Sequence, residues 1–148
     1  MADIHRQAQA QWNGDLRSGS GKTSSGSGAL NELPYSVPSR FESGKGTNPE
    51  ELIAAAHASC FSMMLAKLLG DAQKPPKQIN TNATLTLSQR DGGWKISAIH
   101  LQTEVSGAGL DEPTLKKAAD QAKEQCPISV LLKPGLESLT LDVRLKSS

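Results

Sequence analysis

The chain has 148 residues, a net charge of +1 and only 3% aromatic residues. A nearly neutral chain has no electrostatic attraction for nucleic acid or for an anionic membrane, and so few aromatic side chains offer bases little to stack on. We therefore expect neither nucleic acid nor a membrane as a partner. The length fits a single domain, which we place at residues 1–148, with a core built mainly from aliphatic side chains.

The first part of the chain is polar and predicts two extended segments. Residues 4–12 alternate weakly between apolar and polar types, and the hairpin signal NGD follows at 13–15. A second extended segment is expected from about Leu16 to Ser25. This second segment contains the Gly-Lys-Thr of a phosphate-binding loop. Leu16 stands where that motif needs its first glycine, so a polar strand or turn is the better interpretation.

A connector rich in proline and glycine precedes the most apolar part of the chain. Residues 30–51 are expected to be irregular with one short strand, and Arg40 lies within them. Asn48 is expected to cap a helix that begins at Pro49, carries two glutamates in its first turn, runs to about Leu69 and stops at Gly70.

The apolar run of this helix is LIAAAHASCFSMMLAKLL at 52–69. Its uncharged part, residues 52–66, spans roughly 22 Å as a helix, whereas a membrane span needs about 30 Å. With no secretory signal at the N-terminus, a buried helix of a cytoplasmic protein is favoured. Because nearly every face is apolar, we expect a second copy of the chain to cover what one sheet cannot, which predicts a homodimer.

The rest of the chain groups strands with strands and helices with helices. A strand pair is expected over 79–105 with its hairpin turn at RDGG, then an amphipathic helix over 110–125, a short helix, and a closing strand over 136–145. This order predicts an α+β fold with antiparallel sheet. The expected inward residues of the amphipathic helix are Leu110, Leu115, Ala118, Ala119 and Ala122.

The two cysteines are Cys60, inside the apolar helix, and Cys126, directly before a proline. They are far apart and lack a CxxC motif or a histidine cluster, so we expect no zinc site. From the residues alone, Cys60 is either an inert core residue or a reactive thiol. Cys126 is expected to be the N-cap of the short helix, where backbone amides stabilise a thiolate. His57 is either a base for Cys60 or a satisfied core histidine.

The sequence SRFESGKGTNPEELIAAAHASCFSMML at 39–65, followed by CPIS at 126–129, resembles the OsmC/Ohr family. The family is named for osmotically inducible protein C and organic hydroperoxide resistance protein. The similarity covers nearly the whole chain. The arginine in RFE favours the OsmC branch, because the Ohr branch takes its arginine from an earlier loop.

The resemblance implies a peroxidase that prefers organic hydroperoxides to hydrogen peroxide and serves in oxidative and osmotic stress defence. Cys60 matches the family cysteine that attacks the peroxide and becomes a sulfenic acid, and Cys126 matches the one that then closes a disulfide with it. Arg40 and Glu50 match the family's arginine and glutamate. A dithiol would recycle the disulfide, a lipoyl protein being one candidate.

The resemblance also implies the quaternary structure and the absence of bound groups. The expected assembly is an intertwined homodimer in which antiparallel sheets wrap around long central helices, with two active sites at the subunit interface. No metal or cofactor is expected.

The chemistry of the matched residues is consistent with this activity. Burial raises the pKa of a thiol, so a cation must favour the thiolate of Cys60; Arg40 is suited to this task, and Glu50 to orienting its guanidinium. Two alternatives stay open: a stoichiometric peroxide-sensing redox switch, and a structural or carrier dimer with an inert cavity. The candidates for the wall of a substrate site, or only for the core, are Ile53, Phe61, Met63 and Met64.

Overall fold

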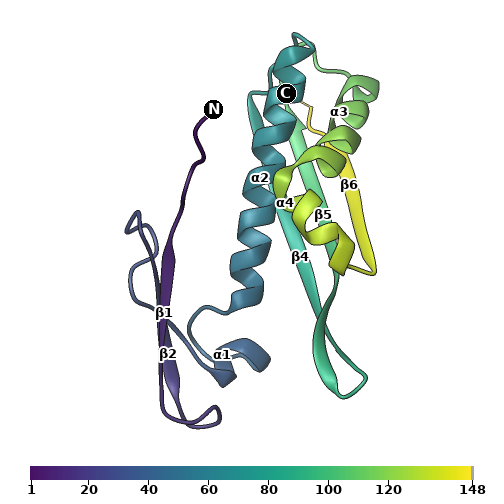
Figure 1. The fold of residues 1–148 in the computed structure, drawn as a ribbon. Coiled ribbons are helices and arrows are strands. Elements are labelled where there is room, and N and C mark those ends of the chain that lie inside the picture. Colours follow the sequence, from purple (N-terminus) through teal and green to yellow (C-terminus); the bar gives the residue numbers. More distant parts are fainter. Residues whose placement is uncertain (148) are drawn as a thin grey trace. The chain divides into compact units, whose positions relative to one another are not determined.

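The computed structural model describes residues 1–147. The chain forms two compact units, Met1–Leu52 and the chain from Ile53 onward, and the boundary between them falls inside one long helix (Figure 1). Because this helix is continuous across the boundary, the single domain expected from the length stays a prediction.

The first unit contains a small antiparallel sheet with the order β1-β2-β3. Its strands are β1 (Ala8–Asn13), β2 (Ser20–Ser25) and β3 (Leu33–Tyr35), so the two expected extended segments and the short strand are confirmed. Both strands are shorter than predicted. The strand β2 begins late because the carboxylate of Asp15 accepts hydrogen bonds from the backbone of Arg17 and Ser18 and closes a loop before it; β1 begins only at Ala8.

The Gly-Lys-Thr sequence lies in the middle strand β2, and its residues pair with both neighbouring strands. A strand paired on both sides cannot form a phosphate-binding loop. The glycine has a packing role: a Cβ at Gly21 would lie 2.5 Å from the ring of Tyr35, which packs against Trp12 with ring centroids 5.5 Å apart.

A short helix, α1 (Val37–Phe41), lies within the connector that was expected to be irregular. Ser36 caps it reciprocally: its hydroxyl accepts the backbone N–H of Ser39, and the hydroxyl of Ser39 accepts the backbone N–H of Ser36. This capping box has serine where glutamate or glutamine is usual, so the sequence pattern did not reveal it.

The long helix α2 (Pro49–Asp71) begins as predicted. The side chain of Asn48 accepts a hydrogen bond from the backbone of Glu51 at 2.8 Å. The helix runs two residues past the predicted last residue, Leu69, because the left-handed turn that closes it is made at Gln73, with φ of 58°, and not at Gly70.

One stripe of α2 is fully buried and most of its other faces are not. The buried residues recur every fourth position, whereas Met63 on another face is 75% exposed. By length and composition, the whole helix could cross a membrane, although its uncharged part alone is too short. A fully buried stripe is, however, typical of a helix that packs in the core of a protein. The stripe comprises His57, Phe61, Leu65 and Leu69.

The second unit contains a sheet with the order β4-β5-β6. The strands β4 (Gln78–Arg90) and β5 (Gly93–Ser106) form the expected antiparallel hairpin, and its turn has positive φ at both Asp91 and Gly92. In β4, Ala83, Leu85 and Leu87 lie on the partly buried face, as predicted.

The strand β6 (Ser138–Leu145) runs parallel to β5, so the expectation of wholly antiparallel sheet is wrong for this pair. Between them the chain forms α3 (Glu112–Gln125), α4 (Pro127–Leu132) and a 3₁₀ turn, η1 (Lys133–Gly135). A connection of this length returns the chain to the same end of the sheet, which permits parallel pairing.

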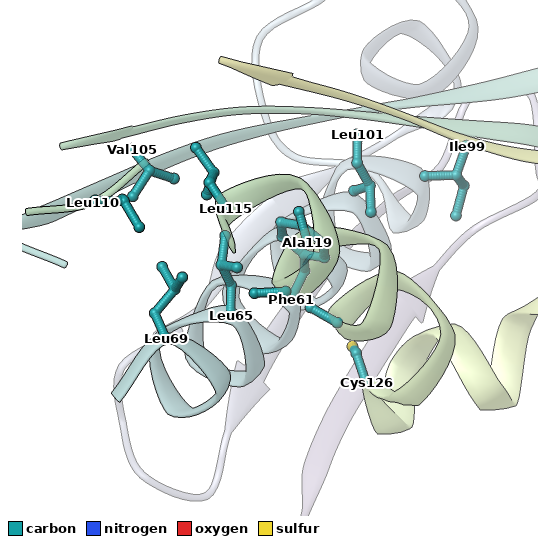
Figure 2. Packing of buried hydrophobic residues seen from close by; sticks show 12 residues of the cluster. Phe61, Leu65, Leu69, Ile99, Leu101, Val105, Leu110, Leu115, Ala119 and Cys126 are labelled. Atoms are coloured by element: carbon teal, nitrogen blue, oxygen red, sulfur yellow. The ribbon is translucent and has the colours of Figure 1, made fainter. Parts of the chain in front are cut away.

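The core of the second unit lies between one face of its sheet and the helices α2 and α3 (Figure 2). Leu110 is buried but precedes α3, which is capped by Asp111, so its predicted place inside the helix is wrong; the other four predicted inward residues are buried in α3. The sheet contributes Ile99, Leu101 and Val105, and α2 contributes Phe61, Leu65 and Leu69.

Candidate active site

The two cysteines lie together in the second unit, although 65 residues separate them along the chain. Cys60 is partly buried on α2, and Cys126 is wholly buried at the start of α4. Cys60 packs against the core cluster that contains Cys126, close enough for Cys126 to act on its thiol, and both thiols are free. The structure therefore brings together the two cysteines that the sequence pattern singled out.

The surroundings of Cys60 oppose its ionisation, as predicted. Burial raises the pKa of the Cys60 thiol, and the neighbouring Cys126 raises it further through a hydrogen bond and through like charge. The backbone N–H of Ile128 donates to Cys60 and acts in the opposite direction. Thus an amide from the first turn of α4 favours the thiolate of Cys60, whereas the sequence analysis expected such amides to stabilise the thiolate of Cys126.

Cys126 is the N-cap residue of α4, as expected from the proline that follows it, but its side chain makes no capping hydrogen bond. The same residue also ends α3, with its backbone N–H bonded to the carbonyl of Ala122. Cys126 therefore sits at a corner between two helices, and both of them fix its backbone.

His57 lies one turn before Cys60 on α2 and is fully buried. Its Nε2 is 2.7 Å from the hydroxyl of Ser129, and its Nδ1 has no hydrogen-bond partner among the described residues. Burial lowers the pKa of His57, so the imidazole is neutral at pH 7. This hydrogen bond favours the core interpretation of His57 over that of a base for Cys60. Ser129 was missed, because nothing in a sequence links it to a histidine 72 residues away.

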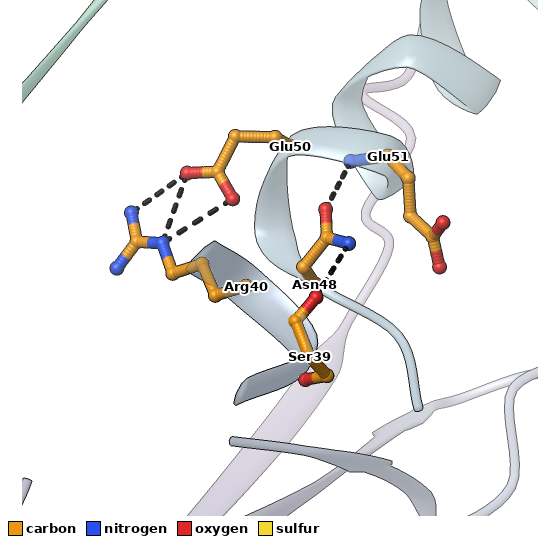
Figure 3. Close-up of polar contacts among 5 residues, drawn as sticks. All are labelled: Ser39, Arg40, Asn48, Glu50 and Glu51. Atoms are coloured by element: carbon orange, nitrogen blue, oxygen red, sulfur yellow. Dashed lines mark hydrogen bonds and ion pairs between the residues drawn. The ribbon is translucent and has the colours of Figure 1, made fainter. Parts of the chain in front are cut away.

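The first unit holds the other two candidate residues, in direct contact (Figure 3). Arg40 donates from Nε to both carboxylate oxygens of Glu50, at 3.1 and 3.2 Å, and from a terminal nitrogen to Oε1 at 2.7 Å. Glu50 is almost buried, whereas the side chain of Arg40 is 40% exposed. The expected ion pair is therefore present, and the side chain of Arg40, whose guanidinium lies over the ring of Phe41, stays partly exposed.

The pair is held by contacts between α1 and the start of α2 (Figure 3). The side-chain amide of Asn48 donates to the carbonyl of Ser39, while its oxygen accepts from Glu51. The hydroxyl of Ser39 donates to the carbonyl of Thr47 at 2.8 Å. These contacts fix the residue before Arg40 and the residues on both sides of Glu50, so both charged groups sit on a rigid support.

The four candidate residues are thus divided between the two units. Arg40 and Glu50 lie in the first unit and both cysteines in the second, and Glu50 precedes Cys60 by ten residues on the continuous helix α2. Among residues 1–147, no three His, Cys, Asp or Glu side chains gather as a metal site requires.

The candidate wall residues differ in exposure. Phe61 is fully buried and points into the core, and Met64 packs partly buried against that core (Figure 2 shows Phe61). Met63 is 75% exposed. Phe61 is therefore a core residue, and Met63 is free to contact something outside this chain.

Comparison with known proteins shows the family. Residues 42–139 match the model for OsmC-like proteins. The chain belongs to this family. It is 47% identical over 144 residues to the peroxiredoxin OsmC of Escherichia coli strain K12, an alignment that covers 97% of this chain and 99% of that protein.

More distant OsmC-like relatives agree with this assignment. The organic hydroperoxide resistance protein of Xanthomonas axonopodis pv. citri is 32% identical over 100 residues, which cover 66% of this chain and 68% of that protein. The fold matches that of the OsmC-like protein of Mycoplasma pneumoniae, with a TM-score of 0.76 at 18% identity over 99% of this chain and all of the other. The higher identity to the OsmC relative supports the predicted branch.

The buried neutral His57 predicts a pH dependence of stability. Because its pKa is lowered from 6.5 in the folded chain, the unfolded chain binds the proton more readily. Stability is therefore full above about pH 6.5 and falls as the pH drops below it, by at most about 1.4 kcal/mol per pH unit. Urea unfolding between pH 7.5 and 5 should show that the free energy of unfolding falls less steeply with decreasing pH for His57→Gln than for the unchanged chain. Equal slopes would contradict a depressed pKa.

Proposed function

We propose that this chain is a thiol peroxidase that reduces organic hydroperoxides to alcohols, and hydrogen peroxide less efficiently. The observation that carries the proposal is the contact between Cys60 and Cys126 in a chain that belongs to the OsmC-like family. The enzyme is of the peroxiredoxin type, in keeping with the names of its OsmC and hydroperoxide-resistance relatives.

In the first step, the thiolate of Cys60 attacks the terminal oxygen of the hydroperoxide. A sulfur–oxygen bond forms and the oxygen–oxygen bond breaks, so that Cys60 becomes a sulfenic acid and the alkoxide leaves and takes up a proton as alcohol. The rate depends on the thiolate fraction, which burial and Cys126 both reduce. A counteracting positive group is therefore essential to the mechanism.

Arg40 is the proposed source of that positive charge. Its guanidinium stays ionised and presents fixed donors, which suit a thiolate and the departing oxygen of a peroxide. Glu50 holds one side of the guanidinium by two-point contact, so the remaining donors keep a defined direction. At about 1.5 Å per residue, the ten positions between Glu50 and Cys60 span about 15 Å, so Glu50 acts through Arg40 and not on the thiol itself.

In the second step, the sulfur of Cys126 attacks the sulfur of Cys60. A disulfide forms, the sulfur–oxygen bond breaks, and hydroxide leaves with the thiol proton as water. A dithiol then reduces the disulfide by two thiol–disulfide exchanges and is itself oxidised. The contact between the two thiols supports this step, because the sulfenic acid is consumed before a second peroxide can oxidise it further.

The apolar setting of Cys60 supports an alkyl hydroperoxide as substrate. Burial of an alkyl group contributes roughly 25 cal/mol per Å², a gain that hydrogen peroxide cannot make. Exposed apolar faces also support a homodimer with two sites, because the single chain leaves Met63 75% and Leu131 71% exposed. We place the enzyme in the cytoplasm, in oxidative and osmotic stress defence.

Replacement of the attacking thiol tests the function itself. Cys60→Ser should lower peroxide consumption with a dithiol reductant to the background rate, because a hydroxyl at this position is not ionised at pH 7. Consumption of cumene hydroperoxide is followed in the presence of excess dithiol. Full activity of the variant would reject the mechanism.

Replacement of the second cysteine separates the two steps. Cys126→Ser should consume about one equivalent of hydroperoxide and then stop, because the sulfenic acid of Cys60 has no resolving thiol. Mass spectrometry of the product should show sulfenic or sulfinic acid at Cys60. An unoxidised Cys60 after this treatment would contradict the assignment.

Removal of the proposed cation tests the role of Arg40. Arg40→Met should slow alkylation of Cys60 near pH 7 by about ten- to hundredfold, because one unit of pKa changes the thiolate fraction about tenfold. The alkylation is measured in a Cys126→Ser background so that a single thiol reacts. Arg90→Met, at an exposed arginine of the β4–β5 hairpin, is the matched control and should react at the original rate. Equal rates for both variants would remove Arg40 from the mechanism.

A stoichiometric peroxide sensor would use the same cysteines without turnover. The nearness of the two thiols fits a sensor as well as it fits an enzyme. The names of the relatives favour an enzyme. Many equivalents of hydroperoxide reduced per chain in the presence of a dithiol would separate the enzyme from the sensor.

A further inference from the structure

Two contacts cross between α2 and the start of α4, one helical turn apart. Cys60 on α2 meets Cys126, and His57, three residues earlier on α2, meets Ser129, three residues later in the chain than Cys126. The second contact is a hydrogen bond of 2.7 Å between side chains that are 0% and 1% exposed. The two pairs therefore form neighbouring contacts of the same helix crossing.

The histidine–serine pair does not stabilise the core as an apolar pair would. Nδ1 of His57 is buried without a partner in the described part of the chain, and a buried polar atom without a hydrogen bond is unfavourable. Its surroundings in the stripe of α2 are apolar. A histidine in this place therefore suggests a need for the directional bond to Ser129, beyond packing.

The helix α4 has one fully buried side chain with which to attach to the rest of the unit. It has six residues, of which Val130 is 58% and Leu131 71% exposed, and Ser129 is its one fully buried residue. Ile128 and Leu132 pack against the core only in part. The hydrogen bond to His57 is thus the most buried attachment within α4 itself, beside the backbone bond that ties Cys126 to α3.

A catalytic serine–histidine pair is a poorer interpretation of the same geometry. A nucleophilic serine needs access to substrate and a third group that orients the histidine. Here the serine is fully buried and the second nitrogen of the imidazole has no partner among residues 1–147. The pair is therefore better suited to hold a structure than to attack a substrate.

We propose that His57 and Ser129 are positioning residues that hold Cys126 against Cys60 and thereby set the rate at which the disulfide closes. This inference rests on the proposed function. A disulfide forms only when the two Cβ atoms come within about 3.5–4.5 Å, so a small shift of α4 would take Cys126 out of reach. The attack of Cys60 on the peroxide comes before the disulfide closes and is made by a residue of α2. The rate of this attack should therefore depend much less on His57 and Ser129.

The test compares the two steps in single-turnover mixing with one equivalent of cumene hydroperoxide. In Ser129→Ala and His57→Leu, the rate of peroxide loss should stay within about threefold of the rate in the unchanged chain. Loss of the two free thiols should slow by about tenfold, the effect of one buried hydrogen bond. Excess peroxide should then convert Cys60 to sulfinic acid in these variants. Ser129→Thr keeps the hydroxyl and should restore most of the rate.

The matched control is Ser59→Ala, at an exposed serine of α2 whose hydroxyl donates to the carbonyl of Ala55 in its own helix. It should behave as the unchanged chain in both steps. Disulfide closure at the original rate in Ser129→Ala would overturn the proposal. Circular dichroism checks that each variant folds, and if His57→Leu does not, Ser129→Ala decides alone.

A second measurement separates this inference from the proposed function. Equilibration with a glutathione redox buffer gives the effective concentration of Cys126 at Cys60 without any peroxide. It should fall by about tenfold in Ser129→Ala and not in Ser59→Ala. If the unchanged chain fails to reduce peroxide, the proposed function is rejected, while an unchanged effective concentration in Ser129→Ala rejects the positioning role.

Discussion

The desolvation of Cys60 is the constraint on which the other features of the site depend. A thiol placed among apolar side chains resists ionisation, and the adjacent Cys126 adds to the rise in pKa. The same surroundings that oppose the thiolate would accept the alkyl part of a hydroperoxide. Activity in such a place requires positive charge and backbone donors to be brought to the sulfur, and one such donor, the amide of Ile128, is already there.

The topology of the second unit supplies the resolving thiol. The chain leaves β5, crosses the core as α3 and turns at Cys126 into α4 before it returns as the parallel strand β6. This crossover packs α3 against the stripe of α2 and leaves Cys126 at the corner beside Cys60. The hydrogen bond between His57 and Ser129 fixes the next turn of the same crossing. The same crossing between α2 and the start of α4 thus belongs to the packing of the fold and brings the two cysteines together.

Local sequence signals predicted the local parts of this arrangement well. The cap at Asn48 and the turn at Asp91 and Gly92 depend on residues close together in the chain. The ion pair between Arg40 and Glu50 was expected only once the family resemblance had singled out these two residues. The parallel pairing of β6 could not be predicted, because strand direction depends on where a crossover ends. The helix α1 was missed because serine replaces the usual glutamate of its capping box. The partner of His57 was missed because it lies 72 residues away.

The central claim is that Cys60 and Cys126 form one redox pair that reacts with a hydroperoxide. Free thiols are counted before and after one equivalent of cumene hydroperoxide, with hydrogen peroxide in parallel and no reductant present. Both thiols of each chain should disappear into an intramolecular Cys60–Cys126 disulfide, and faster with the organic hydroperoxide than with hydrogen peroxide. Two remaining free thiols after the organic hydroperoxide has been added would contradict this claim.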